Sequence, residues 1–243
     1  MTSMPNETEP SFLPEQEWPE NENVNPQNDE FLREVIYFLK SLKPIEPQIT
    51  SLVLKAIPKG ARPYGLEFRV KRWQSLHRKA KDMVRLSPYR FSNVSTQREM
   101  AHIALSLIED VLRYSVLAEE HAELGGSLHS FIAIARANEL DLRCVLNSYH
   151  PTSRYKGIHA HFGLHDRFAL EMWVEVQFHS PESVEAYHDT HSLYEEFRVA
   201  RDLGERQALH DQIEARYATL ENVVLSAVQL PVPITDRVFA RPR

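Results

Sequence analysis

The chain has 243 residues, and 42% of them are hydrophobic, which is enough for one large domain with its own core. No apolar run approaches the roughly 18 residues that span a bilayer, and the acidic N-terminus has no apolar signal segment. Neither a membrane span nor a conventional export signal is therefore expected. The single cysteine, Cys144, excludes an internal disulfide and favours a reducing, cytoplasmic site of action.

The net charge of −6 conceals two regions of opposite sign. Residues 1–30 hold eight acids and no lysine or arginine, which leaves about +2 for the remainder. The stretch from Arg69 to Arg90 holds eight basic residues and one acid, Asp82. A local basic cluster on a nearly neutral body favours phosphate ligands over general nucleic-acid binding, although a solvated helix face has the same composition.

The N-terminal segment over residues 1–28 is predicted to be a disordered, acidic tail. It contains five prolines among asparagines and glutamates, so it cannot bury enough apolar area to offset the entropy of ordering it. The folded domain is expected over residues 29–230, followed by a short tail over 231–243.

The first half of the domain is predicted to be mainly helical. Apolar residues at helical spacing predict helices over 29–43, 47–57, 73–86 and 96–109. Between the second and third helices, Leu66, Phe68 and Val70 alternate with charged residues. This alternation predicts a strand whose open face carries Arg69 and Lys71.

The second half is predicted to hold most of the strands. Strands are expected over 111–117, 141–148, 155–164 and 169–178, and helices over 127–139, from Pro181 to about 200, and over 205–227. In the last strand, Glu175 and Gln177 fall on the polar face. Because helices and strands are mixed and short turns join the later strands, the predicted fold class is α+β, a mixed β-sheet flanked by helices.

Four cationic or hydroxyl side chains lie where they could meet a phosphate chain. Arg69 and Lys71 share the predicted open strand face, and Ser75 and Lys79 lie one turn apart on the next helix. A triphosphate requires such convergence because its charge is spread over many oxygens.

Two carboxylates are candidates for metal binding or acid–base chemistry. Asp110 lies at a helix-to-strand junction, which suits a ligand to Mg²⁺ but also an ordinary helix-end carboxylate. Glu175 could accept a hydroxyl proton or share the metal, and its alternative is a solvent-facing strand edge.

Aromatic and imidazole side chains gather in the predicted strand over 155–164. Tyr155 beside Gly157 could offer a stacking surface for a base, with His159 on the same face. An ordinary half-buried strand could have the same sequence pattern. His159 and His161 have zinc-ligand spacing, but no cysteine or fourth ligand matches them, so zinc is not expected. No P-loop, no Gly-x-Gly-x-x-Gly and no Gly-x-Ser-x-Gly motif occurs in the sequence.

Taken in order, these motifs resemble the RelA/SpoT synthetase family, in its compact, stand-alone, toxin-like branch. The resemblance covers roughly residues 60–200. It rests on Arg69-x-Lys71-x-x-x-Ser75-x-x-x-Lys79, Asp110-x-x-Arg113-Tyr114, Tyr155-x-x-x-His159, Glu175-x-Gln177, His191 and Tyr194-Glu195-Glu196-x-Arg198.

The resemblance implies a nucleotidyltransferase-like fold and an ATP-dependent pyrophosphokinase. Such an enzyme moves the β,γ-diphosphate of ATP to the 3′-hydroxyl of a purine nucleotide, giving a (p)ppGpp- or (p)ppApp-like product and AMP. ATP would be bound by Arg69, Lys71, Ser75 and Lys79. Asp110 and Glu175 would be catalytic and would hold Mg²⁺. The acceptor would be bound by Tyr155, His159, Gln177 and Arg113.

The sequence departs from the family at two of these motifs. The glycine that usually separates the motif aspartate from the arginine is missing between Asp110 and Arg113. His179-Ser180 replaces the Arg-Thr pair that commonly follows the Glu-x-Gln motif. These departures affect the geometry around Asp110 and the contacts with the acceptor.

Several alternatives stay open from the sequence. The same transfer could act on the 3′ end of tRNA, or the chain could be a catalytically silent nucleotide-binding module. The protein could serve housekeeping alarmone synthesis or act as a toxin or effector with an antitoxin, immunity or delivery partner. Tyr155 can stack on any purine, so the sequence does not choose between guanine and adenine.

Overall fold

The computed structural model describes residues 29–138, 140–150, 153–164, 172–223 and 234–236. The predicted tail over 1–28 lies outside the described residues, as do residues 169–171 at the start of the strand expected over 169–178. Within the described part, none of the helices combines the length and apolar character needed to cross a membrane.

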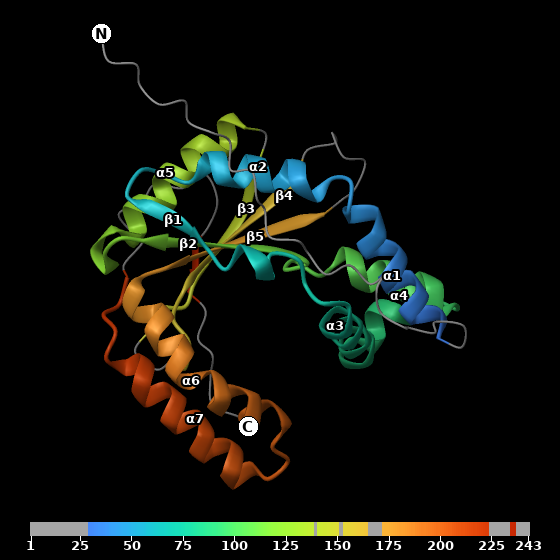
Figure 1. Ribbon diagram of the computed structural model, residues 1–243. Coiled ribbons are helices and arrows are strands. Elements are labelled where there is room, and N and C mark those ends of the chain that lie inside the picture. The colour runs from blue at the N-terminus through green and yellow to red at the C-terminus, as the bar shows by residue number, and fades with distance from the viewer. Residues whose placement is uncertain (1–28, 139, 151–152, 165–171, 224–233, 237–243) are drawn as a thin grey trace.

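A mixed sheet forms the centre of the fold (Figure 1). Its strands are β1 Ala61–Tyr64, β2 Leu112–Ala118, β3 Leu140–Asn147, β4 Ile158–Leu164, β5 Trp173–His179 and β6 Ile234–Asp236. They lie in the order β1-β2-β5-β4-β3-β6, with β2 and β5 parallel, β3 and β6 parallel, and the other neighbours antiparallel. β2 is therefore held beside β5, although β3 and β4 lie between these two strands in the sequence.

Seven α-helices in the described residues surround this sheet. They are α1 Glu30–Leu42, α2 Glu46–Ala56, α3 Trp73–Leu86, α4 Gln97–Ser106, α5 Leu124–Ala137, α6 Pro181–Val199 and α7 Leu203–Ala218. Figure 1 shows α2 and α5 on one side of the sheet and α6 and α7 paired on the other, while α1, α3 and α4 form a group beyond one end. The short 3₁₀ turns are Leu66–Phe68, Pro88–Phe91 and His121–Glu123.

The two faces of β4 and β5 differ in chemistry. On one face, the rings of Phe162 and Phe178 contact Phe131 of α5, with ring centroids 5.6 Å and 5.4 Å apart. Because side chains alternate along a strand, the opposite face of β5 carries Glu175 and Gln177. The core is thus built on one face of these strands, and the other face is left for polar side chains.

The α+β fold class with a mixed sheet is confirmed. The predicted helices over 29–43, 47–57 and 73–86 match α1, α2 and α3 to within a residue at each end. The predicted helix start at Pro181 is also confirmed, because Pro181 is the first residue of α6 after a capping box formed by Ser180 and Ser183.

The predicted strand over residues 66–71 is wrong. The edge strand lies earlier, at β1, and the chain then turns at Gly65, whose φ of 60° lies in the left-handed region. Leu66–Phe68 form a 3₁₀ turn, and only Val70 pairs with the sheet, through an isolated bridge to Leu112. Alternation of apolar and charged residues persisted through a turn, so it did not mark a strand.

Several other boundaries differ from the sequence-based expectation, including that of α4, which ends at Ser106. Helix α5 begins at Leu124 and includes the two glycines that were expected to precede it. Helix α7 ends at Ala218, where the hydroxyl of Thr219 bonds to the carbonyl of Arg216. Residues Ile234–Asp236 of the expected C-terminal tail form β6, which pairs with β3.

Candidate active site

A cleft of about 980 Å³ opens on the polar face of the central strands. Its walls come from the segment before α3 and α3 itself, from β2, β4 and β5, and from α6 and α7. Nine of the ten residues selected from the sequence line this cleft: Lys71, Ser75, Lys79, Asp110, Arg113, Tyr155, His159, Glu175 and Gln177. The fold therefore brings together motifs that span more than a hundred positions of the chain.

On the side of the cleft formed by α3, two lysines hold one carboxylate. Lys71 Nζ lies 2.7 Å from Asp110 Oδ2, and Lys79 Nζ lies 2.7 Å from Asp110 Oδ1. The backbone supports this arrangement, because the N–H of Lys71 donates to the carbonyl of Val111, next to Asp110. Burial opposes ionisation of Asp110, but the two lysines prevail and lower the pKa of its carboxyl.

Lys71 and Lys79 differ in their surroundings. The Lys71 side chain is 16% exposed and that of Lys79 is 43% exposed. Burial lowers the pKa of Lys71, and this effect exceeds the opposing effect of Asp110. Lys79 is the more accessible of the two cations and projects from α3, with Ser75 one turn earlier on the same helix.

Arg69 is not among the residues that line the cleft, and its expected contact with ATP stays a prediction. Its Nε lies 2.6 Å from Glu46 Oε1, and both side chains are at most 4% exposed. The Glu46 carboxylate also accepts from Thr50, whose hydroxyl lies 2.8 Å from that of Tyr114. Arg69 therefore joins the turn before α3 to α2 and β2 through a buried polar network.

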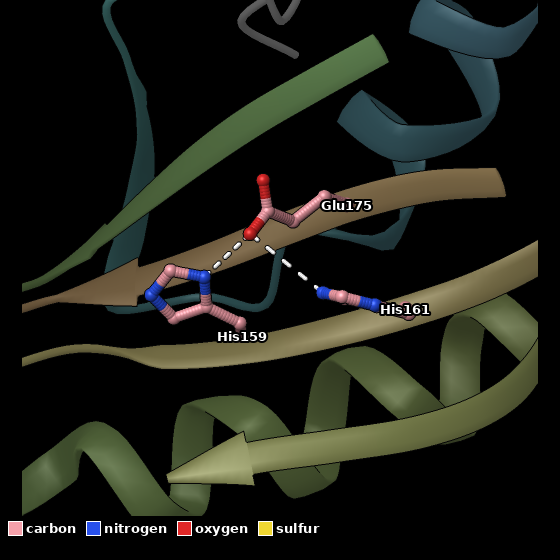
Figure 2. Close-up of side chains that lie close together, drawn as sticks. All are labelled: His159, His161 and Glu175. Carbon is pink, nitrogen blue, oxygen red and sulfur yellow. Dashed lines mark hydrogen bonds and ion pairs between the residues drawn. The ribbon is translucent and has the colours of Figure 1, made fainter. Parts of the chain in front are cut away.

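Deeper in the cleft, a carboxylate is enclosed by two imidazoles (Figure 2). His159 Nδ1 lies 2.5 Å from Glu175 Oε1, and His161 Nε2 lies 3.7 Å from the same oxygen. His161 and Glu175 are paired across β4 and β5, which places them side by side. A further carboxylate, Glu109, approaches the other ring nitrogen of His161, with Oε2 3.0 Å from Nδ1.

The electrostatics of this cluster favour charged forms. Burial opposes ionisation of Glu175, but contacts with His159 and His161 hold the pKa of its carboxyl well below the usual range. Burial likewise opposes the charge on His161, yet contacts with Cys144, Glu109 and Glu175 raise the pKa of this imidazole to about 11. Glu175 is therefore an ionised carboxylate with a cationic imidazole beside it.

Aromatic rings form the next part of the cleft wall. The ring of Tyr155 packs edge-on against those of His159 and His179, at centroid distances of 5.5 Å and 6.2 Å, and lies 6.0 Å from that of Tyr217 on α7. Tyr155 precedes β4 instead of lying within it, so the expected shared strand face with His159 is wrong although the two rings do meet.

Gly157 allows this close packing. A Cβ atom at that position would lie 2.9 Å from the hydroxyl oxygen of Tyr155 and 3.1 Å from Cε1 of His179. Burial and the neighbouring His159 and Arg113 lower the pKa of His179 to about 3, so its imidazole is neutral. The residue that replaces the arginine of the family motif thus adds no charge here.

The structure also adds lining residues that were not selected as site residues. The wall formed by α6 and the segment before β4 contributes Arg154, Tyr187, His191, Tyr194 and Arg198. The guanidinium of Arg154 lies over the rings of Phe197 and Tyr194, 4.6 Å and 5.6 Å from their centroids. Tyr194 and Arg198 are one turn apart within the stretch that resembles the family, a spacing that could have identified them.

No family model and no curated protein matches the sequence. Among solved structures, a GTP pyrophosphokinase family protein from Streptococcus pneumoniae is similar at 13% identity, covering 78% of this chain and 86% of that one, with a TM-score of 0.41. The small alarmone synthetase 2 from Bacillus subtilis is 12% identical over 79% of this chain and 91% of that one, with a TM-score of 0.42.

The small alarmone synthetase 1 from Bacillus subtilis, bound to its product pppGpp, is also similar. It is 12% identical over 76% of this chain and 91% of that one, with a TM-score of 0.41.

Proposed function

We propose that the protein is a pyrophosphokinase that transfers the β,γ-diphosphate of ATP to the 3′-hydroxyl of a purine nucleotide. The observation that carries this proposal is the division of one cleft into two chemically different halves. One half holds Asp110 between two lysines, and the other holds Glu175 beside imidazoles and Tyr155. A two-substrate transfer needs a polyphosphate site and an acceptor site that share one cavity.

The lysine half suits the triphosphate of ATP. Lys71 and Lys79 converge within hydrogen-bond distance of one anionic group, Asp110, so the same two ammonium groups can converge on phosphate oxygens. Ser75 lines the same wall and offers a hydroxyl donor. Arg69 has no part in this proposal, because its guanidinium is buried against Glu46.

The residues of this half also fit Mg²⁺. Mg²⁺ prefers oxygen ligands and is commonly held by one or two carboxylates together with substrate phosphates. Asp110 lies in the cleft as an ionised carboxylate whose two oxygens already attract cations. Asp110 would hold the ion, and the ion would neutralise charge on the transferred group. Glu175 suits this task less well, because His159 and His161 occupy the surroundings of its Oε1.

The second half suits the acceptor. Tyr155 offers an aromatic ring for a purine, and Gln177 and Arg113 lie on neighbouring strands in direct register with His159 and Glu175, respectively. The hydroxyl proton would pass to the pair formed by Glu175 and His159 as the 3′-oxygen bonds to the β-phosphorus. The bond between the β-phosphorus and the oxygen bridging to the α-phosphate then breaks, and AMP leaves with that electron pair.

A transfer assay with a panel of acceptors tests this function. Purified protein is incubated with γ-labelled ATP, Mg²⁺ and, in parallel, GDP, GTP, AMP, ADP or bulk tRNA. We expect label on a purine nucleotide, lost in Asp110→Asn and Glu175→Gln and kept in Asp141→Asn, a control on β3 whose side chain is 41% exposed. Label on tRNA alone would replace the nucleotide by an RNA 3′ end, and no transfer by folded protein that binds ATP would reject the proposal.

A further inference from the structure

Three side chains of the cleft are arranged as metal ligands usually are. His159 and His161 are two residues apart on β4 and therefore point to the same face of the sheet. Glu175 lies directly opposite His161 on β5. One donor atom from each of the three residues lies within 4.8 Å of the others, and all three residues are buried. Figure 2 shows both rings directed at the carboxylate.

Both ring nitrogens of the buried His161 have no hydrogen-bond partner among the described residues, and Nε2 is the one that faces Glu175. His159 contacts Glu175 through Nδ1, so its own unpartnered Nε2 lies on the other side of the ring. Buried polar atoms are paired in nearly all folded proteins, so an unpaired one indicates a missing ligand, ion or water. The 3.7 Å between His161 Nε2 and Glu175 Oε1 is too long for a hydrogen bond but close to the roughly 3.3 Å that separates two ligands of one tetrahedral zinc ion.

We propose that His159, His161 and Glu175 form a binding site for a divalent cation of the zinc and cobalt type. Two imidazole nitrogens and one carboxylate oxygen are the ligands of many zinc sites that keep a fourth position open, and the cleft lies on the open side here. The pair formed by His159 and Glu175, 2.5 Å apart in the structure, separates slightly when both bind the ion.

Glu109 supplies the supporting contact that metal-bound histidines usually have. Its Oε2 lies 3.0 Å from His161 Nδ1, within ion-pair distance, and the metal ion would displace the proton that Nε2 of the cationic ring carries. Carboxylates in this position fix the ring and strengthen the ligand. Glu109 is 46% exposed, so its substitution does not open a buried core.

The donor set separates this site from the one proposed for Mg²⁺. Mg²⁺ prefers oxygen ligands, whereas imidazole nitrogen favours zinc and cobalt. A second cluster with suitable donors, His210, Asp211 and Glu214, lies on α7, but the Asp211 carboxylate is 51% exposed. The proposal does not depend on the proposed transfer activity, and an ion bound by His159 and Glu175 would compete with the proton that this pair accepts in the transfer.

A titration with Co²⁺ tests this site without any activity measurement. Full-length, metal-free protein is titrated with Co²⁺, and the visible absorption of the bound ion reports nitrogen and oxygen ligation. We expect one equivalent that Zn²⁺ displaces and millimolar Mg²⁺ does not. Glu109→Gln should weaken binding by roughly 10–100-fold, and His161→Phe should abolish the absorption. His129→Phe, which alters an exposed histidine on α5, should bind like the wild type.

Circular dichroism confirms that each variant is folded, and Glu175→Gln serves as a second ligand variant if His161→Phe does not fold. The absence of a Co²⁺ absorption band in the wild type would overturn the proposal. So would a band that survives both His161→Phe and Glu175→Gln but is lost in Glu214→Gln, because the ion would then lie in the α7 cluster.

Discussion

Arg69 and Lys71 belong to one sequence motif, but their side chains contact different parts of the fold. The two residues are separated by one position, yet one side chain is buried against Glu46 and the other reaches Asp110 in the cleft. The motif order alone made both residues appear equivalent. The partner of Arg69 lies 23 positions away, at the start of another helix, and no local pattern indicates it.

Arg69→Ala is expected to destabilise the fold, because it leaves the Glu46 carboxylate buried without its cation. Removing one partner of a buried ion pair costs about 3–5 kcal/mol. Urea unfolding measures the change, and Glu46→Gln combined with Arg69→Met should recover a large part of the loss. A variant of unchanged stability with a raised KM for ATP would contradict this account and would return Arg69 to the phosphate site.

Lys79→Met is expected to impair ATP use with little loss of stability. Its pair with Asp110 is partly exposed, and such pairs contribute about 1 kcal/mol or less to stability. Loss of one charged phosphate contact should lower kcat/KM for ATP by about 10-fold or more. The matched control is Lys81→Met. Lys81 lies on α3 like Lys79, is similarly exposed, and forms an ion pair with Asp29 at the start of α1. Equal effects of the two substitutions would argue against a phosphate site.

His179 should make stability depend on pH. Its pKa is held at about 3 by burial and nearby positive charge, whereas an unfolded histidine titrates near 6.5. The unfolded state therefore takes up the proton first, and the contribution of His179 is present above pH 6.5 and is lost as the pH falls. The free energy of unfolding should fall by about 1.4 kcal/mol per pH unit more steeply in the wild type than in His179→Gln. Parallel curves for the two proteins between pH 6.5 and 5 would refute this.

At the scale of elements, amphipathic patterns predicted the first three helices well, whereas the strand expected over 66–71 was wrong. The helix over 73–86 was predicted at the bounds of α3, because the apolar stripe of this helix packs against α1 and α4. Strand ends depend on pairing with distant segments. Val70 meets the sheet at one position only, through Leu112, and this contact cannot be read from alternation.

The same reasoning explains what could be predicted about the site. Lys71, Asp110 and Glu175 were identifiable from residue type and order, and the fold places them in one cleft. The contact of Glu175 with His161 could not be predicted, because it depends on the antiparallel register of β4 and β5. His161 was therefore seen only as half of a two-histidine pattern without further ligands.

The segment that leads into β4 positions Tyr155, and within it Gly157 leaves the space that the Tyr155 ring occupies. Ser148 holds this segment, since its backbone N–H and its hydroxyl both donate to the carbonyl of Gly157, at 3.0 Å and 2.8 Å.

Gly157→Ala would push a methyl group against Tyr155 and His179. We expect the KM for the acceptor to rise severalfold while the KM for ATP stays within about twofold, a change of less than roughly 0.4 kcal/mol. Unchanged acceptor kinetics would show that Tyr155 does not bind the acceptor.

At the scale of the whole molecule, two helical walls face each other across the polar side of the sheet. The wall with α3 carries lysines, and the wall with α6 and α7 has its own small apolar core, which includes Phe197, Ile213 and Tyr217. Tyr155 packs against that second core and also touches His159 of the sheet. The cleft thus has a cationic wall and an aromatic wall, as expected for a polyphosphate and a base bound together.

The central claim is that the diphosphate moves as a unit, and the fate of the α-phosphate tests it most directly. Protein, Mg²⁺ and the preferred acceptor are incubated with ATP labelled at the α- or the γ-position in parallel reactions. The account predicts that α-label appears in AMP, that γ-label appears on the acceptor in equal amount, and that Asp110→Asn makes neither. Formation of ADP with a singly phosphorylated acceptor, or hydrolysis with no labelled acceptor, would contradict it.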